Sequence, residues 1–169
     1  MANRVLGIEI GQNLTRVVEI DYKTKNPKVH SMFSFPTPPE MIEDGVVHAD
    51  SMFRSMLYSK IKEKKINTNK AVFVLNSTRI ASREMELPLV KEKQIKDLLQ
   101  MNASDYFPVD LSKYQLAYSV LGENKDSKTG MLQHRLMVMA APTTLLDGYY
   151  ELAKALKLEL LSLDYAGNS

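Results

Sequence analysis

The segment Ile80–Leu121, IASREMELPLVKEKQIKDLLQMNASDYFPVDLSKYQLAYSVL, decides the fold that we predict for this chain. Its pattern predicts a charged strand that stops at Pro88, then a helix, then a turn marked by Phe107 and Pro108, and then a second strand over 114–121. Apolar residues recur at three- and four-residue spacing in the helix and alternate in the second strand. We therefore expect a small sheet that is covered by a helix.

Toward the C-terminus, the pattern predicts a polar loop over Gly122–Gly130, a long strand over Leu132–Ala141, a helix from Thr143 or Thr144, and a last strand over Leu158–Asp164. This second module reads β-α-β-β-α-β. No element follows its final leucine-rich strand, so we expect that strand to pair with the sheet of the preceding module, in a fold that continues further.

Toward the N-terminus, the pattern predicts a first module with a different order of elements. Asp50 is a suitable N-cap for its helix, which should run to about Lys65. The predicted strands are Val5–Ile10, Leu14–Ile20 and Val29–Phe35 before that helix, and Ala71–Leu75 after it. Three antiparallel strands, a helix and another strand indicate an α+β or α/β module with the helix on the sheet.

The composition sets limits on function. The chain has 169 residues, which suits one ordinary domain or two small ones, and its 44% hydrophobic and 25% charged residues are typical of a globular protein. A net charge of +2 does not indicate a nucleic-acid partner. There is no cysteine, so neither disulfides nor a cysteine metal site can form, and no run approaches the ~18 apolar residues of a membrane span.

The stretch Gly7–Asn13 has two interpretations. A strand followed by a glycine turn, with an acid inside the strand, can hold phosphate on backbone N–H groups and a hydrated metal ion on the acid. Alternatively, the glycines only permit a tight hairpin. The dinucleotide fingerprint is excluded, because a strand rather than a helix follows Gly11.

Other polar residues also leave two interpretations. Asn102, on an apolar helical stripe, is either satisfied by neighbouring backbone or anchors a bound peptide. The adjacent Tyr106-Phe107-Pro108 either forms an apolar wall for that peptide or belongs to the core. Glu84 and Glu86 share a strand face, which favours an exposed edge over a catalytic pair. The three histidines lie far apart and are interpreted as surface or structural residues. No local pattern predicts acid–base or covalent catalysis.

The ordered set VLGIEIGQNLTRVVEI, REMELP, DYFPVDL, QLAYSVL and LMVMAAPTTLLDGYYELAKALKLELLSLD resembles PilM, the actin-like cytoplasmic family of type IV pilus assembly. The resemblance covers essentially the whole chain and about the N-terminal half of a family member. It implies a partial actin-like (ribonuclease H-like) core subdomain with an inserted β-α-β-β-α subdomain of the FtsA/PilM type. Residues 1–78 would begin the core, 79–157 would be the insertion, and 158–169 would return to the core.

The resemblance also implies ATP and Mg²⁺ in the full-length protein. Gly11, Gln12, Asn13 and Arg16 would then face the phosphates, and Glu9 would lie near the metal through a water. The pattern departs from many relatives, which carry Asp, Ser and Lys at positions 9, 12 and 16. The adenosine pocket and the second phosphate loop would lie beyond the C-terminal residue. We therefore expect weak or no ATP binding by this piece, and at most a weak ATPase at full length.

The partner that the resemblance implies is the cytoplasmic tail of a PilN-like membrane protein, held in a groove between the core and the inserted subdomain. Its expected lining is Arg83, Leu87, Asn102, Tyr106 and Phe107. The protein would act as a cytoplasmic scaffold at the inner face of the membrane, held there by partners that include other platform proteins and the assembly ATPase, in the service of twitching motility and competence. The alternatives are an FtsA-like ATPase or polymerising protein, and the cytoplasmic part of a type II secretion platform protein.

Overall fold

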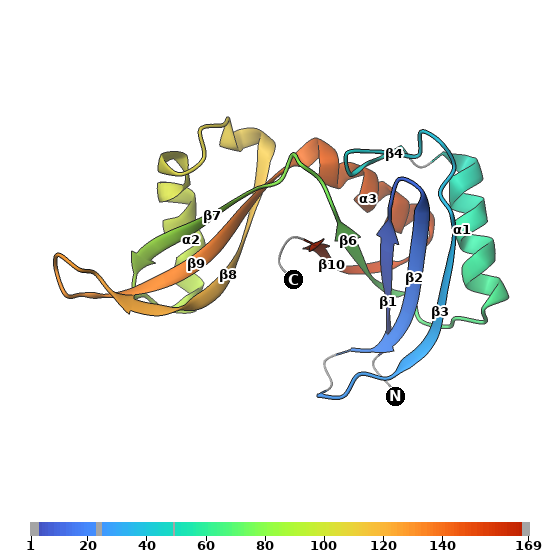
Figure 1. Ribbon diagram of the computed structural model, residues 1–169, viewed down its shortest axis with the longest axis horizontal. Coiled ribbons are helices and arrows are strands. Elements are labelled where there is room, and N and C mark those ends of the chain that lie inside the picture. The colour runs from blue at the N-terminus through green and yellow to red at the C-terminus, as the bar shows by residue number, and fades with distance from the viewer. Residues whose placement is uncertain (1–3, 23–24, 49, 167–169) are drawn as a thin grey trace. The chain divides into compact units, whose positions relative to one another are not determined.

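The computed structural model describes residues 4–22, 25–48 and 50–166. The chain forms two compact units (Figure 1). Unit 1 comprises Met1–Thr78 and Thr144–Ser169, and unit 2 comprises Arg79–Thr143. Unit 2 is therefore an insertion within the sequence of unit 1.

Unit 1 is built on a five-stranded sheet in the order β10-β6-β1-β2-β3. The first three strands form an antiparallel meander, whereas β6 and β10 run parallel to β1. This sheet therefore combines antiparallel and parallel pairing. Its strands are β1 (Arg4–Ile10), β2 (Leu14–Asp21), β3 (Val29–Pro36), β6 (Lys70–Leu75) and β10 (Glu159–Tyr165).

Helices α1 (Ser51–Glu63) and α3 (Thr143–Ala155) pack on the same face of this sheet. Through the strand register, Phe35 and Phe73 point to one face, because cross-strand partners share a face. The Phe35 ring lies 6.3 Å from that of Phe53 in α1, and the Phe73 ring lies 5.6 Å from that of Tyr149 in α3. Burial of these aromatic side chains fixes both helices on the sheet.

The sequence pattern correctly predicts the start of α1. The side chain of Asp50 accepts a hydrogen bond from the backbone N–H of Phe53 at 2.7 Å, which satisfies one of the free donors of the first turn. Phe53, Leu57 and Ile61 then recur at four-residue spacing and are buried. The helix ends at Glu63, slightly before the predicted end at Lys65.

A short hairpin that the sequence pattern did not predict joins β3 to α1. It consists of β4 (Ile42–Glu43) and β5 (Val46–Val47). Its turn needs Gly45, which has φ +82°, and a Cβ there would lie 2.7 Å from the Cβ of Ser77. The Asp44 carboxylate accepts hydrogen bonds from the N–H and hydroxyl of Thr78, at 2.8 and 2.7 Å. The hairpin is thus tied to the end of the first segment of unit 1.

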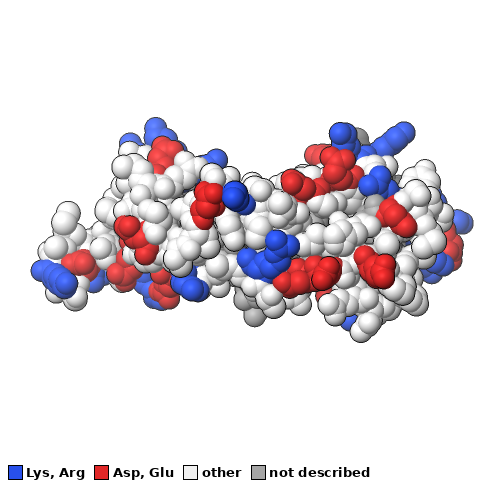
Figure 2. Space-filling model, turned by 90° about the horizontal axis from the view of Figure 1, so that it is seen from above, with Lys and Arg blue, Asp and Glu red and all other residues white. Residues whose placement is uncertain are grey.

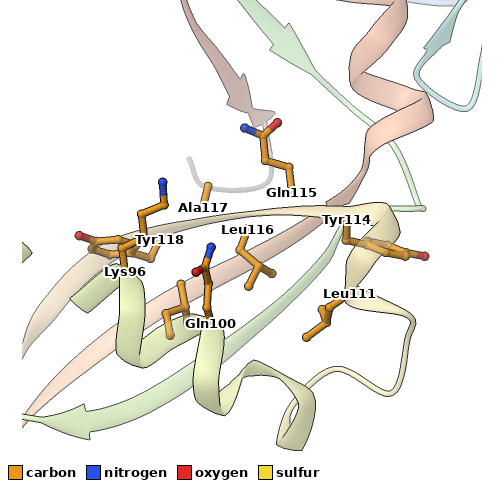
Figure 3. Close-up of a pocket in the computed structure, with 9 residues that line it drawn as sticks. Lys96, Gln100, Leu111, Tyr114, Gln115, Leu116, Ala117 and Tyr118 are labelled. Atoms are coloured by element: carbon orange, nitrogen blue, oxygen red, sulfur yellow. The ribbon is translucent and has the colours of Figure 1, made fainter. Parts of the chain in front are cut away.

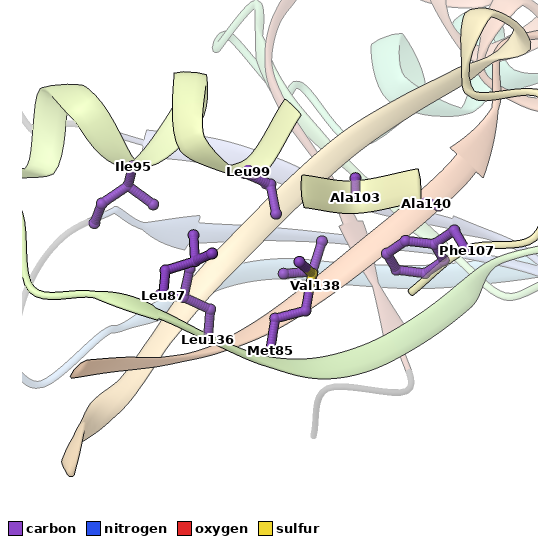
Figure 4. Close-up of a cluster of buried hydrophobic side chains, with 9 residues drawn as sticks. All are labelled: Met85, Leu87, Ile95, Leu99, Ala103, Phe107, Leu136, Val138 and Ala140. Carbon is purple, nitrogen blue, oxygen red and sulfur yellow. The ribbon is translucent and has the colours of Figure 1, made fainter. Parts of the chain in front are cut away.

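Unit 2 is a three-stranded antiparallel sheet in the order β7-β9-β8, with helix α2 on one face. Its elements are β7 (Ala81–Pro88), α2 (Glu92–Asn102), two 3₁₀ turns over Ala103–Asp105 and Leu111–Lys113, β8 (Tyr114–Lys125) and β9 (Leu132–Pro142). Figure 4 shows the side chains between helix and sheet. The buried cluster is Met85, Leu87, Ile95, Leu99, Ala103, Phe107, Leu136, Val138 and Ala140.

Strand β8 is longer than expected. The predicted polar loop begins at Gly122, but pairing with β9 continues to Lys125 past an irregularity between Val120 and Gly122. Leu121 is the extra residue of this bulge, and the ladder resumes at Gly122. The turn proper is stabilised by Asp126, whose carboxylate accepts from the N–H and hydroxyl of Thr129 at 2.6 and 2.8 Å.

The boundary between the units differs from the expected insertion over 79–157. Unit 2 ends at Thr143, and α3 belongs with unit 1. The reason is that the buried face of α3 packs on the unit 1 sheet, where Tyr149 meets Phe73. Gly148 of the same helix lies against the backbone of Val47 in β5. The insertion therefore reads β-α-β-β, without a second helix. The returning strand is β10 within the expected 158–169, of which residues 167–169 lie outside the described part.

Candidate functional site

The glycine hairpin between β1 and β2 is a close-packed turn. The N–H of Gly11 donates to the carbonyl of Leu14 at 3.1 Å, and a Cβ on Gly11 would lie 3.0 Å from that same oxygen. Gln12 and Asn13 are exposed at the tip, and the Asn13 carbonyl accepts from the N–H of Thr37 at 3.1 Å. A side chain at position 11 would crowd the turn, and the Gly11 amide is engaged within the chain.

The acid that was expected near a metal is part of a cross-strand ion pair. Glu9 and Arg16 are register partners, and the Arg16 guanidinium donates to Oε2 of Glu9 at 3.0 Å. Their side chains are 37% and 56% exposed, so the pair is solvated and contributes little stability. In this conformation Glu9 and Arg16 satisfy each other, so these residues do not by themselves fit a phosphate and a hydrated metal.

No group of three or more His, Asp or Glu side chains that could hold a metal ion occurs among the described residues. Two of the three histidines have structural contacts. His30 hydrogen-bonds Asp21 at 2.7 Å, and this bond lowers the pKa of the Asp21 carboxyl below its ordinary value. His134 is buried, and its Nε2 lies 2.8 Å from the carbonyl of Val90. The first contact joins β2 to β3, and the second holds the loop after β7 against β9.

The five residues expected to line a peptide groove all lie in unit 2, in different environments. Leu87 and Phe107 are each 2% exposed and belong to the core cluster (Figure 4), so their side chains face the core instead of a surface. Asn102 donates from Nδ2 to the carbonyl of Leu98 at 2.7 Å. This agrees with the interpretation in which the Asn102 side chain is satisfied by neighbouring backbone. Arg83 and Tyr106 are exposed. The structure therefore brings Leu87 and Phe107 together, and leaves only Arg83 and Tyr106 well exposed to a partner.

A groove of about 500 Å³ lies between α2 and β8 in unit 2 (Figure 3). Its lining combines three leucines, two tyrosines and a few polar groups. It comprises Lys96, Leu99 and Gln100 of α2, Leu111 of the second 3₁₀ turn, and Tyr114, Gln115, Leu116, Ala117 and Tyr118 of β8. A mostly apolar lining with a few polar groups is typical of ligand sites. We call this surface the β8 groove.

Sequence reasoning did not predict the β8 groove, although part of its signal was present. The alternation in β8 correctly places Leu116 and Tyr118 on the face toward the helix, since both pack against the core cluster. Lys96 and Gln100 are four residues apart on α2 and so lie on one side of the helix. No local sequence pattern predicts that β8 lies at the border of its sheet.

The face of the molecule that Figure 2 shows does not indicate a polyanion site. On the face that Figure 2 shows, basic and acidic side chains are interspersed over each unit, without a broad area of one sign.

Within the described part of the chain, no helix has the length and hydropathy needed to cross a membrane.

The fold is that of an actin-like protein core that carries an inserted α+β unit, which confirms the predicted fold class. No protein-family model matches the sequence. The chain is similar to a chain of the PilM–PilN type IV pilus biogenesis complex, with a TM-score of 0.80 and 22% identity over 96% of its length. It is also similar to the cytoplasmic domain of EpsL, an inner membrane component of the type II secretion system of Vibrio cholerae, with a TM-score of 0.53 and 12% identity over 95% of its length.

These similarities concern the fold, and the expected resemblance to PilM is confirmed at that level. The chain spans 47% of the matched chain of the PilM–PilN complex and 57% of the EpsL chain. It therefore corresponds to about half the length of the proteins that it matches.

Proposed function

We propose that this chain is part of an actin-like scaffold protein of a type IV pilus inner-membrane platform, and that the scaffold binds the cytoplasmic tail of a PilN-like membrane protein. The observation that carries this proposal is the similarity of nearly the whole chain, both units included, to a chain of the PilM–PilN complex. A similarity restricted to the sheet of unit 1 would have indicated only an actin-like core. Further platform proteins and the assembly ATPase are additional partners in this proposal.

The proposed tail contacts are the exposed residues of the expected set, Arg83 and Tyr106. Tyr106 is 38% exposed and follows the helix that covers unit 2, and the Arg83 guanidinium donates to the carbonyl of Ser82 at 2.8 Å. Tyrosine and arginine are the residue types that most often dominate binding interfaces. Leu87, Asn102 and Phe107 support this surface from within the unit.

The proposal is tested by calorimetry of the protein with a synthetic peptide of the PilN-like tail encoded in the same genome. We expect binding that weakens about tenfold in Tyr106→Ala and in Arg83→Ala, because each loses one interface anchor. Tyr58→Ala is the matched control, since Tyr58 is 49% exposed and lies on α1 of unit 1. Absence of binding by the wild-type protein would refute the function, and unchanged affinity in both variants would remove the two residues from the site.

Nucleotide binding is proposed only for the longer protein. Gly11, Gln12, Asn13 and Arg16 would face the phosphates and Glu9 the hydrated Mg²⁺, and this requires the ion pair between Glu9 and Arg16 to open. An equilibrium-dialysis comparison of this chain with the longer protein tests it. Micromolar ATP affinity of this chain alone would contradict it. ATP turnover with filament formation by the longer protein would favour an FtsA-like role instead.

A second candidate function is the cytoplasmic part of a type II secretion platform protein. The similarity to the cytoplasmic domain of EpsL favours it. The TM-score of 0.53 is lower than the 0.80 of the pilus complex, so the pilus function is preferred. The downstream gene sequence distinguishes the two candidate functions, because a membrane-spanning segment encoded after residue 169 would favour the secretion protein.

A further inference from the structure

The outer edge of β8 lies at the border of the unit 2 sheet. The sheet order of unit 2 is β7-β9-β8, and β9 is the strand that pairs with β8. Within the described part of the chain, no strand pairs with the other side of β8. Such an edge presents a row of backbone N–H and C=O groups that can pair with a further strand.

The two edges of this sheet differ in how they are protected. Strand β7 carries Arg83, Glu84 and Glu86 and ends in Pro88, and charges and proline are the usual protection against strand pairing. Strand β8 carries no charged residue over 114–120, and its bulge lies beyond that segment, between Val120 and Gly122. The regular part of β8 is thus the unprotected edge.

The β8 groove follows this edge. Its lining includes consecutive residues of β8 from Tyr114 to Tyr118, whose side chains alternate between the two faces of the sheet. Figure 3 shows Leu116 on the side of α2, and Gln115 and Ala117 on the opposite side of the strand. Because residues of both faces border the groove, it runs along the edge of β8 and is not confined to one face of the sheet.

The helix side of the groove has the spacing that an extended peptide needs. Lys96 and Gln100 are one turn of α2 apart, which is about 6 Å along the helix axis. Alternate residues of a strand are about 6.6 Å apart. Two side chains at positions i and i+2 of an added strand can therefore reach Lys96 and Gln100, while the partly buried Leu111 and Leu116 offer an apolar surface.

The charge of the groove selects the peptide. Lys96 is the charged residue of the lining, which contains no Asp or Glu. Its side chain is exposed, and no ion pair or hydrogen bond of Lys96 occurs among the described residues. A carboxylate on the peptide therefore complements the groove, whereas a basic side chain would be repelled.

We propose that the β8 groove binds an extended segment of a partner protein as a fourth strand of the unit 2 sheet, with an acidic side chain at Lys96 and alternate aliphatic side chains over the partly buried Leu111 and Leu116. Main-chain hydrogen bonds to β8 supply affinity, and the side chains in the groove supply specificity. This site is separate from Arg83 and Tyr106, which are not part of its lining. It does not depend on the proposed pilus function.

The test begins with a phage-displayed library of linear ten-residue peptides, selected on the immobilised protein. We expect enriched peptides that alternate acidic and aliphatic residues with polar ones. A fluorescein-labelled consensus peptide should bind in anisotropy titrations, and Lys96→Glu should weaken it at least tenfold. Exchanging the peptide's acid for lysine should restore binding to that variant. Lys93→Glu is the matched control, because Lys93 is exposed on α2 but does not line the groove.

Strand addition itself is tested by N-methylation of the consensus peptide. A paired strand directs alternate N–H groups toward its neighbour. Methyl groups on one alternate set should abolish binding, and those on the other set should have little effect. Three results would each overturn the proposal. They are an equal loss of affinity with both sets of methyl groups, equal affinity of the Lys96→Glu and Lys93→Glu variants, and no enrichment of peptides from the library. A dimer that dissociates in Lys96→Glu would also overturn it, by showing that a second copy occupies the edge.

Discussion

Replacement of Gly148 by alanine should destabilise the protein, although the same change stabilises most helices. In α3, a Cβ at Gly148 would lie 2.6 Å from the carbonyl oxygen of Val47 and 3.3 Å from its Cβ. Alanine gains about 1 kcal/mol over glycine in a helix interior. Overpacking costs about 1–3 kcal/mol. The upper end applies here because the obstructing atom belongs to the backbone.

The net expectation for Gly148→Ala is a loss of about 2 kcal/mol, which corresponds to a fall in Tm of about 4–8 °C for a chain of this size. Urea unfolding followed by far-ultraviolet circular dichroism measures it. Asp147→Ala is the matched control, since the neighbouring residue is exposed on the same helix and should gain up to about 0.7 kcal/mol. A Gly148→Ala variant as stable as the wild type would show that α3 and β5 do not approach as closely as the structure indicates.

Three further changes give distinct expectations. Hydrogen bonding by His30 lowers the pKa of Asp21, so the Asp21 carboxylate stabilises the fold above its ordinary pKa of 3.8, and this stability is lost as pH falls below that value. Asp21→Asn should therefore lower Tm at pH 7 and much less at pH 3. An equal loss of Tm at both pH values would contradict this. Leu136→Ala should cost about 2–5 kcal/mol in urea unfolding, because Leu136 is fully buried in unit 2, and a cost below 1 kcal/mol would exclude that packing. Thr15→Val should cost about 1–3 kcal/mol, because it removes the 2.8 Å partner of the buried Thr37 hydroxyl, whereas Thr15→Ser should retain most of the stability; equal losses would rule out the hydrogen bond as the cause.

The sequence predicts the positions of helices and strands better than it predicts which of these elements pack together. The cap at Asp50 and the alternation of β8 are local signals, and both are present in the structure. The stripe on α3 shows that this helix has a buried face, but not which sheet covers it, and the contact between Tyr149 and Phe73 decides that. The two-residue strands β4 and β5 are too short for any periodicity to be visible.

The candidate sites were predicted less well, because a site depends on which side chains remain exposed. Leu87 and Phe107 were expected to line a groove because of the resemblance to PilM, yet both fill the core of unit 2. Glu9 and Arg16 were considered separately, and only the register of β1 and β2 shows that they are neighbours. The β8 groove follows from the position of a strand in its sheet, which is a property of the whole unit.

The place where the chain leaves and re-enters unit 1 has a consequence for biosynthesis. Ala81 and Ala140 are register partners, so the start of β7 and the end of β9 lie about 5 Å apart. A ribosome completes all of residues 79–143 before it makes β10. The nascent polypeptide must therefore keep the exposed side of β6 available until the last parallel strand emerges, and slow maturation of the inserted segment would prolong that interval.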